Sequence, residues 1–441
     1  MDFNKLIKRI IDVSYVAKEG HIASSLSILH ILYVLYGKIL NKTDHHFILS
    51  KGHASLGLYT ILEHFGLLED DLNSLCKFNS KLGGHPSNKL KYVEASTGSL
   101  GHGLPMGVGM ALGEKILDSG KKVFVIIGDG ESNEGTIWES ALLASNHKLN
   151  NLYCIMDYNH SNDRALKLGN VLDKFKAFNW ECVEIDGHSE EDITKALSTI
   201  TSEKPIFVLA NTIKGKGIRL MENNPEWHHK SPNLEEYIKI VSSLLIDDVV
   251  KLKGKIPDIG QSDDEIMVLA GVADVTKNVI GNIAEVGVYS GGSAKLIKRF
   301  KNNDKKMYLF DTFSGLSDCN ENDGEYLKNG FFIYDYELVK KEFEDDKDVT
   351  LYKGYFPDST NIDIDNDNFS LVHLDVDTYT STLNCLNYFY DKMTKGGIIV
   401  IHDYQMHSQI DGVPLAVDEF LSDKNEIIIT LNTTQGLINK L

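Results

Sequence analysis

Short apolar runs recur along the first half of the chain, separated by amphipathic stretches with helical spacing. The runs are VFVII (123–127), LYCIM (152–156), ECVEI (181–185) and IFVLA (206–210). Because they are continuous rather than alternating, they predict strands that are buried on both faces. Strands of this kind between helical segments are typical of a parallel sheet covered by helices.

The same pattern restarts in the second half. A last helical stretch (233–246) is followed by residues 247–264, which mix charge, Gly and Pro without periodicity. Six further apolar runs then follow: IAEVG (283–287), MYLFD (307–311), VTLYKG (349–354), SLVHLDVD (370–377), GIIVIHD (397–403) and EIIITL (426–431). The two halves share no motif in register. We therefore predict an α/β protein of two domains, 1–246 and 265–441, each with a mainly parallel sheet flanked by helices, joined by a linker at 247–264.

Composition narrows the class of protein. The 441 residues are enough for two or three domains of about 150 residues each. A net charge of -18 argues against nucleic acid as a partner. The sequence contains neither the apolar core of a signal peptide nor eighteen consecutive apolar residues, so we expect a cytoplasmic protein with no membrane association. The five cysteines form no CxxC pair, which favours reduced thiols.

The first candidate site follows a predicted strand. Gly128-Asp129-Gly130 comes directly after VFVII, at the carboxyl end where open α/β sheets bind ligands. Glycines allow main-chain N–H groups to approach a phosphate, and an aspartate between them can hold a hard cation. By itself such a triplet is usually only a turn. Asn159, however, lies at the end of the next predicted strand, so both side chains would emerge from adjacent strand ends.

The surrounding residues resemble the transketolase family, and in particular the separate N-terminal subunits of two-piece transketolases, from about residue 2 to 246. The resemblance implies a thiamine diphosphate-binding fold. The stretches that carry it are GHIASS, LSKGHASLGLY, LGGHPS, TGSLGHGLPMGVGMALGEK, GDGESNEGTIWESALLASNHKLNNL, MDYNH and TIKGKGIRLMENNPEWHHKSP.

This resemblance implies roles for individual residues near the phosphates. Asp129, Asn159 and the main-chain carbonyl of Ser161 would ligate Mg²⁺. His53 and Gly130 would contact the diphosphate.

The resemblance also implies a second group around the reactive part of the cofactor. Gly98 and Leu100 would lie beside the aminopyrimidine ring. His21, His85 and His228 match histidines of the substrate channel, where imidazoles can hydrogen-bond a sugar and move protons.

Glu134 matches the acidic residue after the GDG turn and is expected in the cofactor network between subunits. Ser99 and His102 depart from the family's usual Pro and Gln. In this family a glutamate on a second, pyrimidine-binding domain activates the thiazolium carbon, and nothing after residue 246 resembles that domain. We therefore expect an oligomer in which a separate C-terminal subunit supplies the pyrimidine domain. The alternative is a non-catalytic scaffold or docking domain.

A glycine-rich motif opens the second domain. Glu285, Gly287 and Gly291 form an E-x-G-x-x-x-G arrangement between a predicted strand and a helix, and Asp311 ends the next strand. Such a motif permits close approach of a nucleoside, with the acid on ribose hydroxyls, but by itself it also suits a dinucleotide.

The later motifs distinguish these possibilities. The run LVHLDVDTYTSTLNCLNYFYDKMTKGGIIVIHDY, with DTFSGL, KGYFPDS and GVPLAVDEF, resembles the macrocin O-methyltransferase family over about residues 280–422. This implies a class I Rossmann-like fold, S-adenosylmethionine as cofactor, Mg²⁺ on Asp375 and Asp403, and Asp377 as the base. His402 replaces the second aspartate that is usual before Asp403. As an imidazole ligand it leaves the identity of the metal open.

Together the two resemblances predict a bifunctional carbohydrate-modifying transferase. One half would take part in two-carbon ketol transfer with a partner chain. The other would methylate a hydroxyl on a sugar or nucleotide-linked sugar. The alternative for the acidic residues of the second half is that they merely cap strands and helices.

Overall fold

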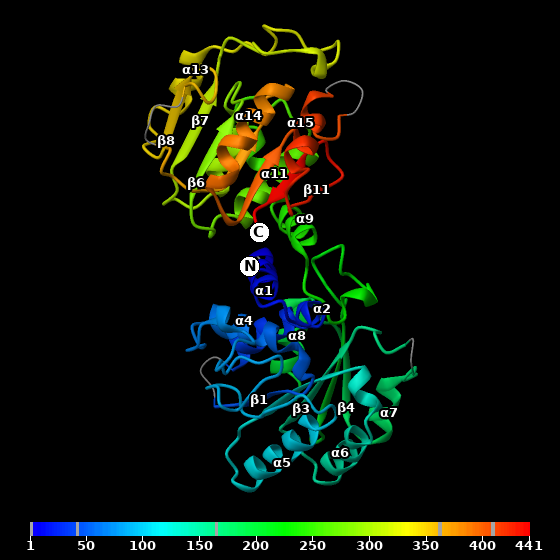
Figure 1. The fold of residues 1–441 in the computed structure, drawn as a ribbon. Helices are drawn as coiled ribbons and strands as arrows, with labels where there is room; N and C mark the ends of the chain where they lie inside the picture. Colours follow the sequence, from blue (N-terminus) through cyan, green and yellow to red (C-terminus); the bar gives the residue numbers. More distant parts are fainter. Residues whose placement is uncertain (1–2, 41–43, 164–165, 360–363, 407–410) are drawn as a thin grey trace. The chain divides into compact units, whose positions relative to one another are not determined.

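The computed structural model of the chain divides into two compact units, residues 1–233 and 234–441, each described here by itself (Figure 1). The residues that the structure describes are 3–40, 44–163, 166–359, 364–406 and 411–441.

The division between the units comes earlier than the boundary expected after residue 246. Helix α9 (Leu234–Leu244) groups with the second unit, because it packs closely on α11 (Asp263–Val275). A Cβ atom on Gly271 of α11 would overlap the hydroxyl oxygen of Ser242 in α9, so glycine at this position helps the two helices to approach each other. The expected linker is also partly helical, since α10 spans Ile246–Lys253.

The first unit is built on a five-stranded sheet in the order β1-β2-β3-β5-β4, with every pairing parallel. The strands are β1 (His46–Leu49), β2 (Val123–Gly128), β3 (Leu152–Tyr158), β4 (Glu181–Asp186) and β5 (Ile206–Asn211). Strands β2 to β5 are the four predicted runs. Strand β1 was not predicted, because its four residues HFIL are too short to show a pattern.

Helices cover both faces of this sheet. Figure 1 shows α5 and α6 on the face opposite α2 and α4. Residue Gly107 lets α5 lie directly on β2, where an added Cβ would stand 2.5 Å from the Val125 side chain. The helices of this unit are α1 (Phe3–Ala17), α2 (Ile22–Ser27), α3 (Leu29–Val34), α4 (Ser55–His64), α5 (Gly103–Ile116), α6 (Gly135–Asn146), α7 (Val171–Ala177) and α8 (Glu190–Ser198).

The second unit holds a seven-stranded sheet in the order β11-β12-β10-β9-β6-β7-β8. Strand β12 runs antiparallel to both of its neighbours, β10 and β11, and the other pairings among the described strands are parallel. The strands are β6 (Asn282–Val286), β7 (Met307–Asp311), β8 (Val349–Lys353), β9 (Phe369–Leu374), β10 (Met393–Ile401), β11 (Ile428–Thr430) and β12 (Gly436–Asn439). The strand order reverses between β6 and β9, and ligands of open α/β sheets bind at such a switch point.

Further helices complete the second unit, and the α/β class predicted for both halves is confirmed. Helix α11 begins at a capping box between Ser262 and Glu265. The helices after it are α12 (Gly292–Phe300), α13 (Tyr336–Glu342), α14 (Tyr379–Phe389) and α15 (Gly412–Leu421). No helix in the described part of the chain is both long and apolar enough to cross a bilayer.

Candidate functional sites

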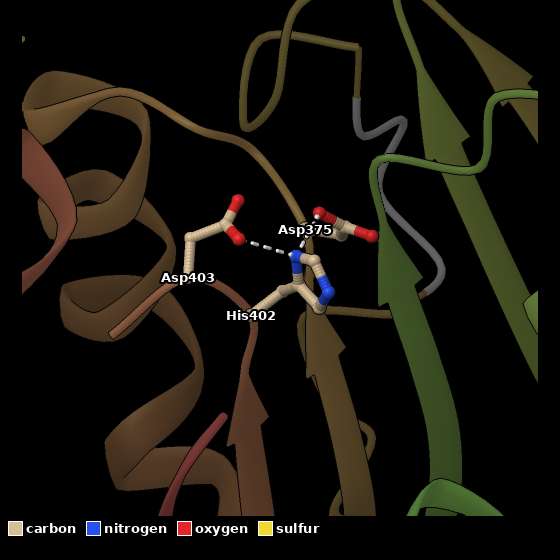
Figure 2. Close-up of side chains that lie close together, drawn as sticks. All are labelled: Asp375, His402 and Asp403. Atoms are coloured by element: carbon tan, nitrogen blue, oxygen red, sulfur yellow. Dashed lines mark ion pairs between the residues drawn. The ribbon is translucent and has the colours of Figure 1, made fainter. Parts of the chain in front are cut away.

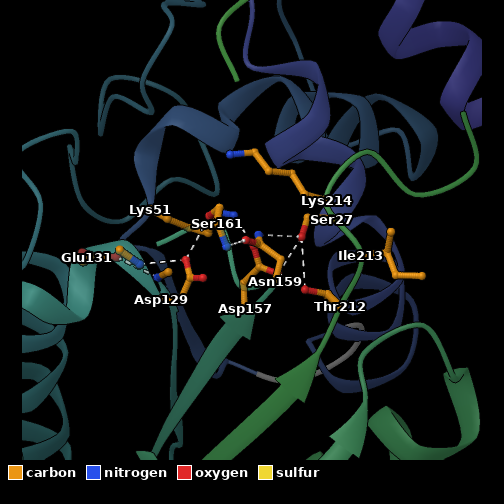
Figure 3. Close-up of polar contacts among 12 residues, drawn as sticks. Ser27, Lys51, Asp129, Glu131, Asp157, Asn159, Ser161, Thr212, Ile213 and Lys214 are labelled. Atoms are coloured by element: carbon orange, nitrogen blue, oxygen red, sulfur yellow. Dashed lines mark hydrogen bonds and ion pairs between the residues drawn. The ribbon is translucent and has the colours of Figure 1, made fainter. Parts of the chain in front are cut away.

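Chemically versatile side chains gather at the carboxyl edge of each sheet. In the second unit Asp375, His402 and Asp403 lie together beyond β9 and β10 (Figure 2). In the first unit Asp129 and Asn159 lie beyond β2 and β3 (Figure 3). In both units this is the edge at which parallel sheets bind ligands.

The predicted metal ligands of the first unit lie together. Strands β2 and β3 are in register at Gly128 and Asp157, so Asp129 and Asn159 follow neighbouring strand ends, and both are buried. One carboxylate oxygen of Asp129 accepts hydrogen bonds from the Gly130 N–H at 2.7 Å and from the Ser161 hydroxyl at 3.2 Å. The Ser161 N–H donates to the side-chain oxygen of Asn159 at 3.1 Å.

A buried carboxylate that the sequence reasoning did not single out orients Asn159. Asp157 is fully buried and accepts hydrogen bonds from the Asn159 side-chain amide at 2.9 Å and the Ser27 hydroxyl at 2.7 Å. Its carboxylate also accepts from the Thr212 hydroxyl and is ion-paired with the ammonium of Lys51 (Figure 3). Because the amide N–H₂ of Asn159 is engaged here, its oxygen is left to face Ser161. The polar Asp157 inside an apolar strand was the available signal.

Three of the predicted site histidines form a cluster. The ring centroids of His21 lie 5.2 Å from His53 and 5.7 Å from His228. Burial lowers the pKa of His21 to about 4 and that of His53 to about 2; nearby histidines add to the shift of His21, and the charge of Lys51 adds to that of His53. These imidazoles are therefore neutral at pH 7 and can act as both donors and acceptors. His229, which was not predicted, stacks on His21 at 4.4 Å.

The predicted aminopyrimidine residues lie on a loop beside His85. Gly98 has a φ of 144°, and an added Cβ would stand 3.0 Å from the His85 ring, so glycine allows the ring to approach the main chain. Leu100 is 38% exposed. Glu134 is also exposed, and it packs against Gly101, where an added Cβ would stand 2.6 Å from its side chain.

Glu131 is the buried acid of the GDG turn, and it was not predicted. It accepts hydrogen bonds from the N–H groups of Gly101 at 2.9 Å and Gly128 at 3.1 Å, and from the Ser50 hydroxyl. Burial raises its pKa. Glu131 thus fastens the loop that carries Leu100 to the end of β2.

Two lysines add positive charge to this site, and the sequence reasoning assigned neither. Lys51 is buried, and its neighbour in sequence is Gly52 of the LSKGH motif. Lys214 lies with its ammonium 2.6 Å from a ring nitrogen of His228. Burial, followed by the charge of Lys51, lowers the pKa of Lys214 to about 8. Both lysines lie in sequence motifs that carry the transketolase resemblance, but only histidines of these motifs were predicted to have a role in the site.

The second site is a cavity of about 460 Å³ at the carboxyl ends of β6, β7, β9 and β10. Its wall contains six of the predicted site residues, which were assigned to cofactor binding, metal binding or proton removal. They are Gly287, Asp311, Asp375, Asp377, His402 and Asp403. Two other predicted residues, Glu285 and Gly291, are not among the described residues of its wall. Glu285 is fully buried in β6 and is paired with the ring of His373 at 2.8 Å.

The glycine-rich turn is held by Asp311. Its carboxylate accepts hydrogen bonds from the N–H groups of Val288 and Tyr289, both at 2.8 Å. A Cβ on Gly287 would overlap the main-chain oxygen of Asp375, and the φ of 88° also favours glycine. Gly291, with a φ of 84°, directly precedes α12 as its N-cap residue. These contacts fix the turn in a tight conformation in which Gly287 and Tyr289 form part of the cavity wall.

His402 lies between carboxylates (Figure 2). Its Nδ1 is 3.2 Å from Asp375 and 3.0 Å from Asp403, and its Nε2 is 3.6 Å from Glu265. Burial opposes a positive charge on the ring, but the three carboxylates outweigh it and raise the pKa of His402. Burial and the charges of Asp375 and Asp403 raise the pKa of Asp377.

This arrangement has the character of a cation site. The side-chain donor atoms of Asp375, His402 and Asp403 all lie within 4.8 Å of one another. Both ring nitrogens of His402 and one oxygen of Asp403 are buried without a hydrogen bond of good geometry among the described residues. Buried polar atoms of this kind call for a partner such as a metal ion.

Two residues around this cluster were not predicted. Gln261 donates to Asp375 at 3.0 Å, and Glu265 approaches His402 from the start of α11. Both lie in the stretch interpreted as linker or at its end. The S-x-x-E pattern of residues 262–265 was the signal that a helix begins there.

Comparisons with known proteins give one family match in each half of the chain. The family model for the thiamine diphosphate binding domain of transketolase matches residues 5–245. The model for macrocin-O-methyltransferase (TylF) matches residues 267–434.

Individual relatives match mainly the first half. The A-subunit of the apulose-4-phosphate transketolase of Phocaeicola vulgatus is 38% identical over 251 residues, covering 53% of this chain and 89% of the relative. Its counterpart from Actinobacillus succinogenes is 40% identical over 233 residues, covering 49% and 84%. The solved transketolase of Campylobacter jejuni is similar in fold, with a TM-score of 0.51 at 21% identity, over 71% of this chain and 65% of that one.

Since the transketolase model alone matches more than half of the chain, the protein belongs to the transketolase family through its thiamine diphosphate binding domain, and it is a carbohydrate-modifying transferase in which this domain is followed by a domain that the macrocin-O-methyltransferase model matches.

Proposed function

We propose that the first unit supplies the diphosphate half of a thiamine-dependent ketol transferase. The observation that carries this proposal is the meeting of Asp129, Asn159 and Ser161 at one sheet edge, beside two lysines and a cluster of neutral histidines. Carboxylate, amide and carbonyl oxygens are the ligands that Mg²⁺ prefers, so this donor set fits a magnesium ion.

The residues of this chain would bind and orient the cofactor. Asp129, Asn159 and the main-chain oxygen of Ser161 would hold Mg²⁺, and the buried ammonium groups of Lys51 and Lys214 would offset the phosphate charge. His53 and Gly130 would lie at the diphosphate, and Gly98 and Leu100 beside the aminopyrimidine. When bound, the cofactor supplies a nucleophilic carbanion at its thiazolium carbon.

The histidines would act on the sugar. His21, His85 and His228 would line the substrate channel. A neutral imidazole can donate a hydrogen bond to a carbonyl or accept one from a hydroxyl, and it can pass a proton between them. The depressed pKa of His21 keeps its ring in this neutral form at pH 7.

A second chain would complete the site. The relatives from Phocaeicola vulgatus and Actinobacillus succinogenes are each named as one lettered subunit of a transketolase, and the residues that follow residue 266 here match a methyltransferase. We therefore infer that a separate pyrimidine-domain chain brings the activating glutamate and binds the substrate phosphate, with Glu134 at the contact between the chains. The assembly would be an oligomer with cofactor sites between chains.

For the second unit we propose methyl transfer from S-adenosylmethionine to a sugar hydroxyl. The cavity beside the turn at Gly287 would hold the cofactor, with Asp311 near its ribose. Asp375, His402 and Asp403 would hold a divalent cation that positions two hydroxyls. Because an imidazole belongs to this donor set, we expect Mn²⁺ to be accepted at least as well as Mg²⁺. Asp377 would remove the proton of the hydroxyl that is methylated.

The proposed base can be tested by substitution. Asp377→Asn should abolish methyl transfer while S-adenosylmethionine binding, measured by calorimetry on the full chain, stays within about twofold of the parent. Asp391→Asn, at an exposed position of the same unit, is the matched control and should keep full turnover. An unchanged rate in Asp377→Asn would exclude this residue as the base.

A further inference from the structure

His402 turns its two ring nitrogens toward different carboxylates. Nδ1 lies 3.2 Å from Asp375 and 3.0 Å from Asp403, the two residues joined to it by dashed lines in Figure 2. Nε2 lies 3.6 Å from Glu265, which is an ion-pair contact and longer than a hydrogen bond. Because an ionised carboxylate only accepts, each ring nitrogen needs either a hydrogen or a cation beside it.

The Nδ1 side of the ring is the one that suits a metal ion. The donor atoms of Asp375, His402 and Asp403 lie within 4.8 Å of one another. The Asp403 oxygen nearest to Nδ1 is buried and lacks a hydrogen bond of good geometry among the described residues. A cation at Nδ1 leaves Nε2 to carry the ring hydrogen, and the acceptor on that side is Glu265.

Glu265 is fixed in place by hydrogen bonds to both of its carboxylate oxygens. Oε2 accepts from the N–H of Ser262 at 2.8 Å and from its hydroxyl at 2.7 Å, as part of the capping box of α11. Oε1 accepts from the Thr434 hydroxyl. The residue is 5% exposed. Its carboxylate is therefore held in one orientation beside the ring of His402.

Helix capping does not account for the whole of this arrangement. The capping box uses Oε2 of Glu265, whereas Oε1 is the oxygen that faces Nε2 of His402. A cap would also work at an exposed position, but this carboxylate is buried. Glu265 lies between the two family matches, which end at residue 245 and begin at residue 267. Neither likeness therefore assigns it a role.

We propose that Glu265 is a positioning residue of the cation site, which holds His402 with Nε2 toward itself and Nδ1 toward the metal ion. Histidines that ligate metals usually donate their other N–H to a carboxylate, which fixes the orientation of the ring and raises its basicity. Because Mn²⁺ accepts an imidazole ligand more readily than Mg²⁺ does, Glu265 also shifts the choice of metal toward Mn²⁺. This inference rests on the cation site proposed for the second unit.

The experiment measures the binding of Mn²⁺, and separately of Mg²⁺, to the full chain by calorimetry without S-adenosylmethionine. Every protein carries Asp129→Ala, which removes a ligand of the cation site proposed for the first unit. Glu265→Gln removes the charge but keeps the capping box, in which Gln can replace Glu. Asp264→Asn is the matched control, because Asp264 is an exposed carboxylate in the same helical turn. Calorimetric unfolding without metal checks the fold of each variant.

Glu265→Gln should weaken Mn²⁺ binding by about tenfold or more, which is typical for the loss of a carboxylate that orients a ligating histidine. Mg²⁺ binding should weaken less, and Asp264→Asn should bind both ions as the parent does. In a His402→Asp background, Glu265→Gln should change Mn²⁺ binding by less than about threefold, because the imidazole through which it acts is gone. Thr434→Val leaves the capping box intact and frees Oε1, and it should also weaken Mn²⁺ binding.

An equal loss of Mn²⁺ affinity in the two backgrounds would overturn the inference, because Glu265 would then act by its charge alone and not through His402. Unchanged Mn²⁺ binding in Glu265→Gln, or in Thr434→Val should Glu265→Gln fail to fold, would overturn it as well. An equal loss for both metals would refute the effect on metal choice. Absence of Mn²⁺ binding by the parent would contradict the cation site itself, and with it this inference.

Discussion

The buried ion pair between Lys51 and Asp157 can be broken by substituting either residue. The Lys51 side chain is 2% exposed and that of Asp157 is 0% exposed. Removing one member of a buried pair typically costs about 3–5 kcal/mol, because the other charge stays buried alone. After Lys51→Met the carboxylate keeps its two hydroxyl donors and its amide donor, so we expect a cost of about 3 kcal/mol. Asp157→Asn leaves the ammonium without its ion-pair partner, so its cost should be larger, about 4–5 kcal/mol.

Tryptophan fluorescence reports this change without interference from the second unit. All three tryptophans of the chain, Trp138, Trp180 and Trp227, lie in the first unit. For a unit of this size, about 3 kcal/mol lowers the midpoint of thermal unfolding by roughly 6–12 °C. The midpoint of the full chain should fall by this amount in Lys51→Met and by more in Asp157→Asn.

The double variant decides whether the two residues act as a pair. Lys51→Met with Asp157→Asn should cost less than the sum of the single variants, by about 2 kcal/mol, because no unpaired charge is left. Lys91→Met is the control, since Lys91 pairs with Glu69 at the surface, and its midpoint should not change. If the cost of the double variant equals the sum of the two single costs within about 0.5 kcal/mol, the proposed coupling is refuted.

Two further predictions concern the cofactors. Gly287→Ala should weaken S-adenosylmethionine binding more than tenfold, because the added Cβ would overlap the main chain of Asp375. The control is Gly396→Ala, which should bind normally, because Gly396 has a similar φ of 82° but open space around it. Equal binding by both variants would contradict the steric argument. Lys214 is charged below its pKa of about 8 and neutral above it. The affinity for thiamine diphosphate, measured by titration in the presence of the partner chain, should therefore fall as the pH rises from 7 to 9. In Lys214→Met this decrease should be absent, and an equal decrease would exclude Lys214 as its cause.

Much of the fold could be predicted because buried parallel strands are continuous apolar runs. Strands β2 to β5 and β6 to β11 coincide with the predicted runs, within a few residues at their ends. Strands β1 and β12 have four residues each, too few to stand out in a sequence. The boundary predicted after residue 246 coincides with the end of the transketolase match at residue 245, whereas the compact units divide before α9, because α9 packs on α11.

Some residues of the candidate sites could be predicted from the sequence and others could not. Residues inside motifs, such as Asp129 and Asn159, could be singled out because they directly follow strands. Lys51 and Gln261 were missed because their significance lies in contacts with residues roughly a hundred positions away. Asp157 was missed as well, although a polar residue inside an apolar strand was a signal in the sequence. The ion-pair partner of a charged group at the end of a long side chain can be identified only when the fold is known.

The central claim is that the first unit holds half of a thiamine site and depends on another chain for the rest. The most direct test measures ketol transfer from a ketose phosphate to an aldose phosphate by the full chain with Mg²⁺ and thiamine diphosphate, alone and with a separately produced pyrimidine-domain chain. We predict no transfer above background for the protein alone, transfer when the second chain is added, and none with the second chain when Asp129→Ala is used. Transfer by the protein alone at the rate of the mixture would contradict the claim.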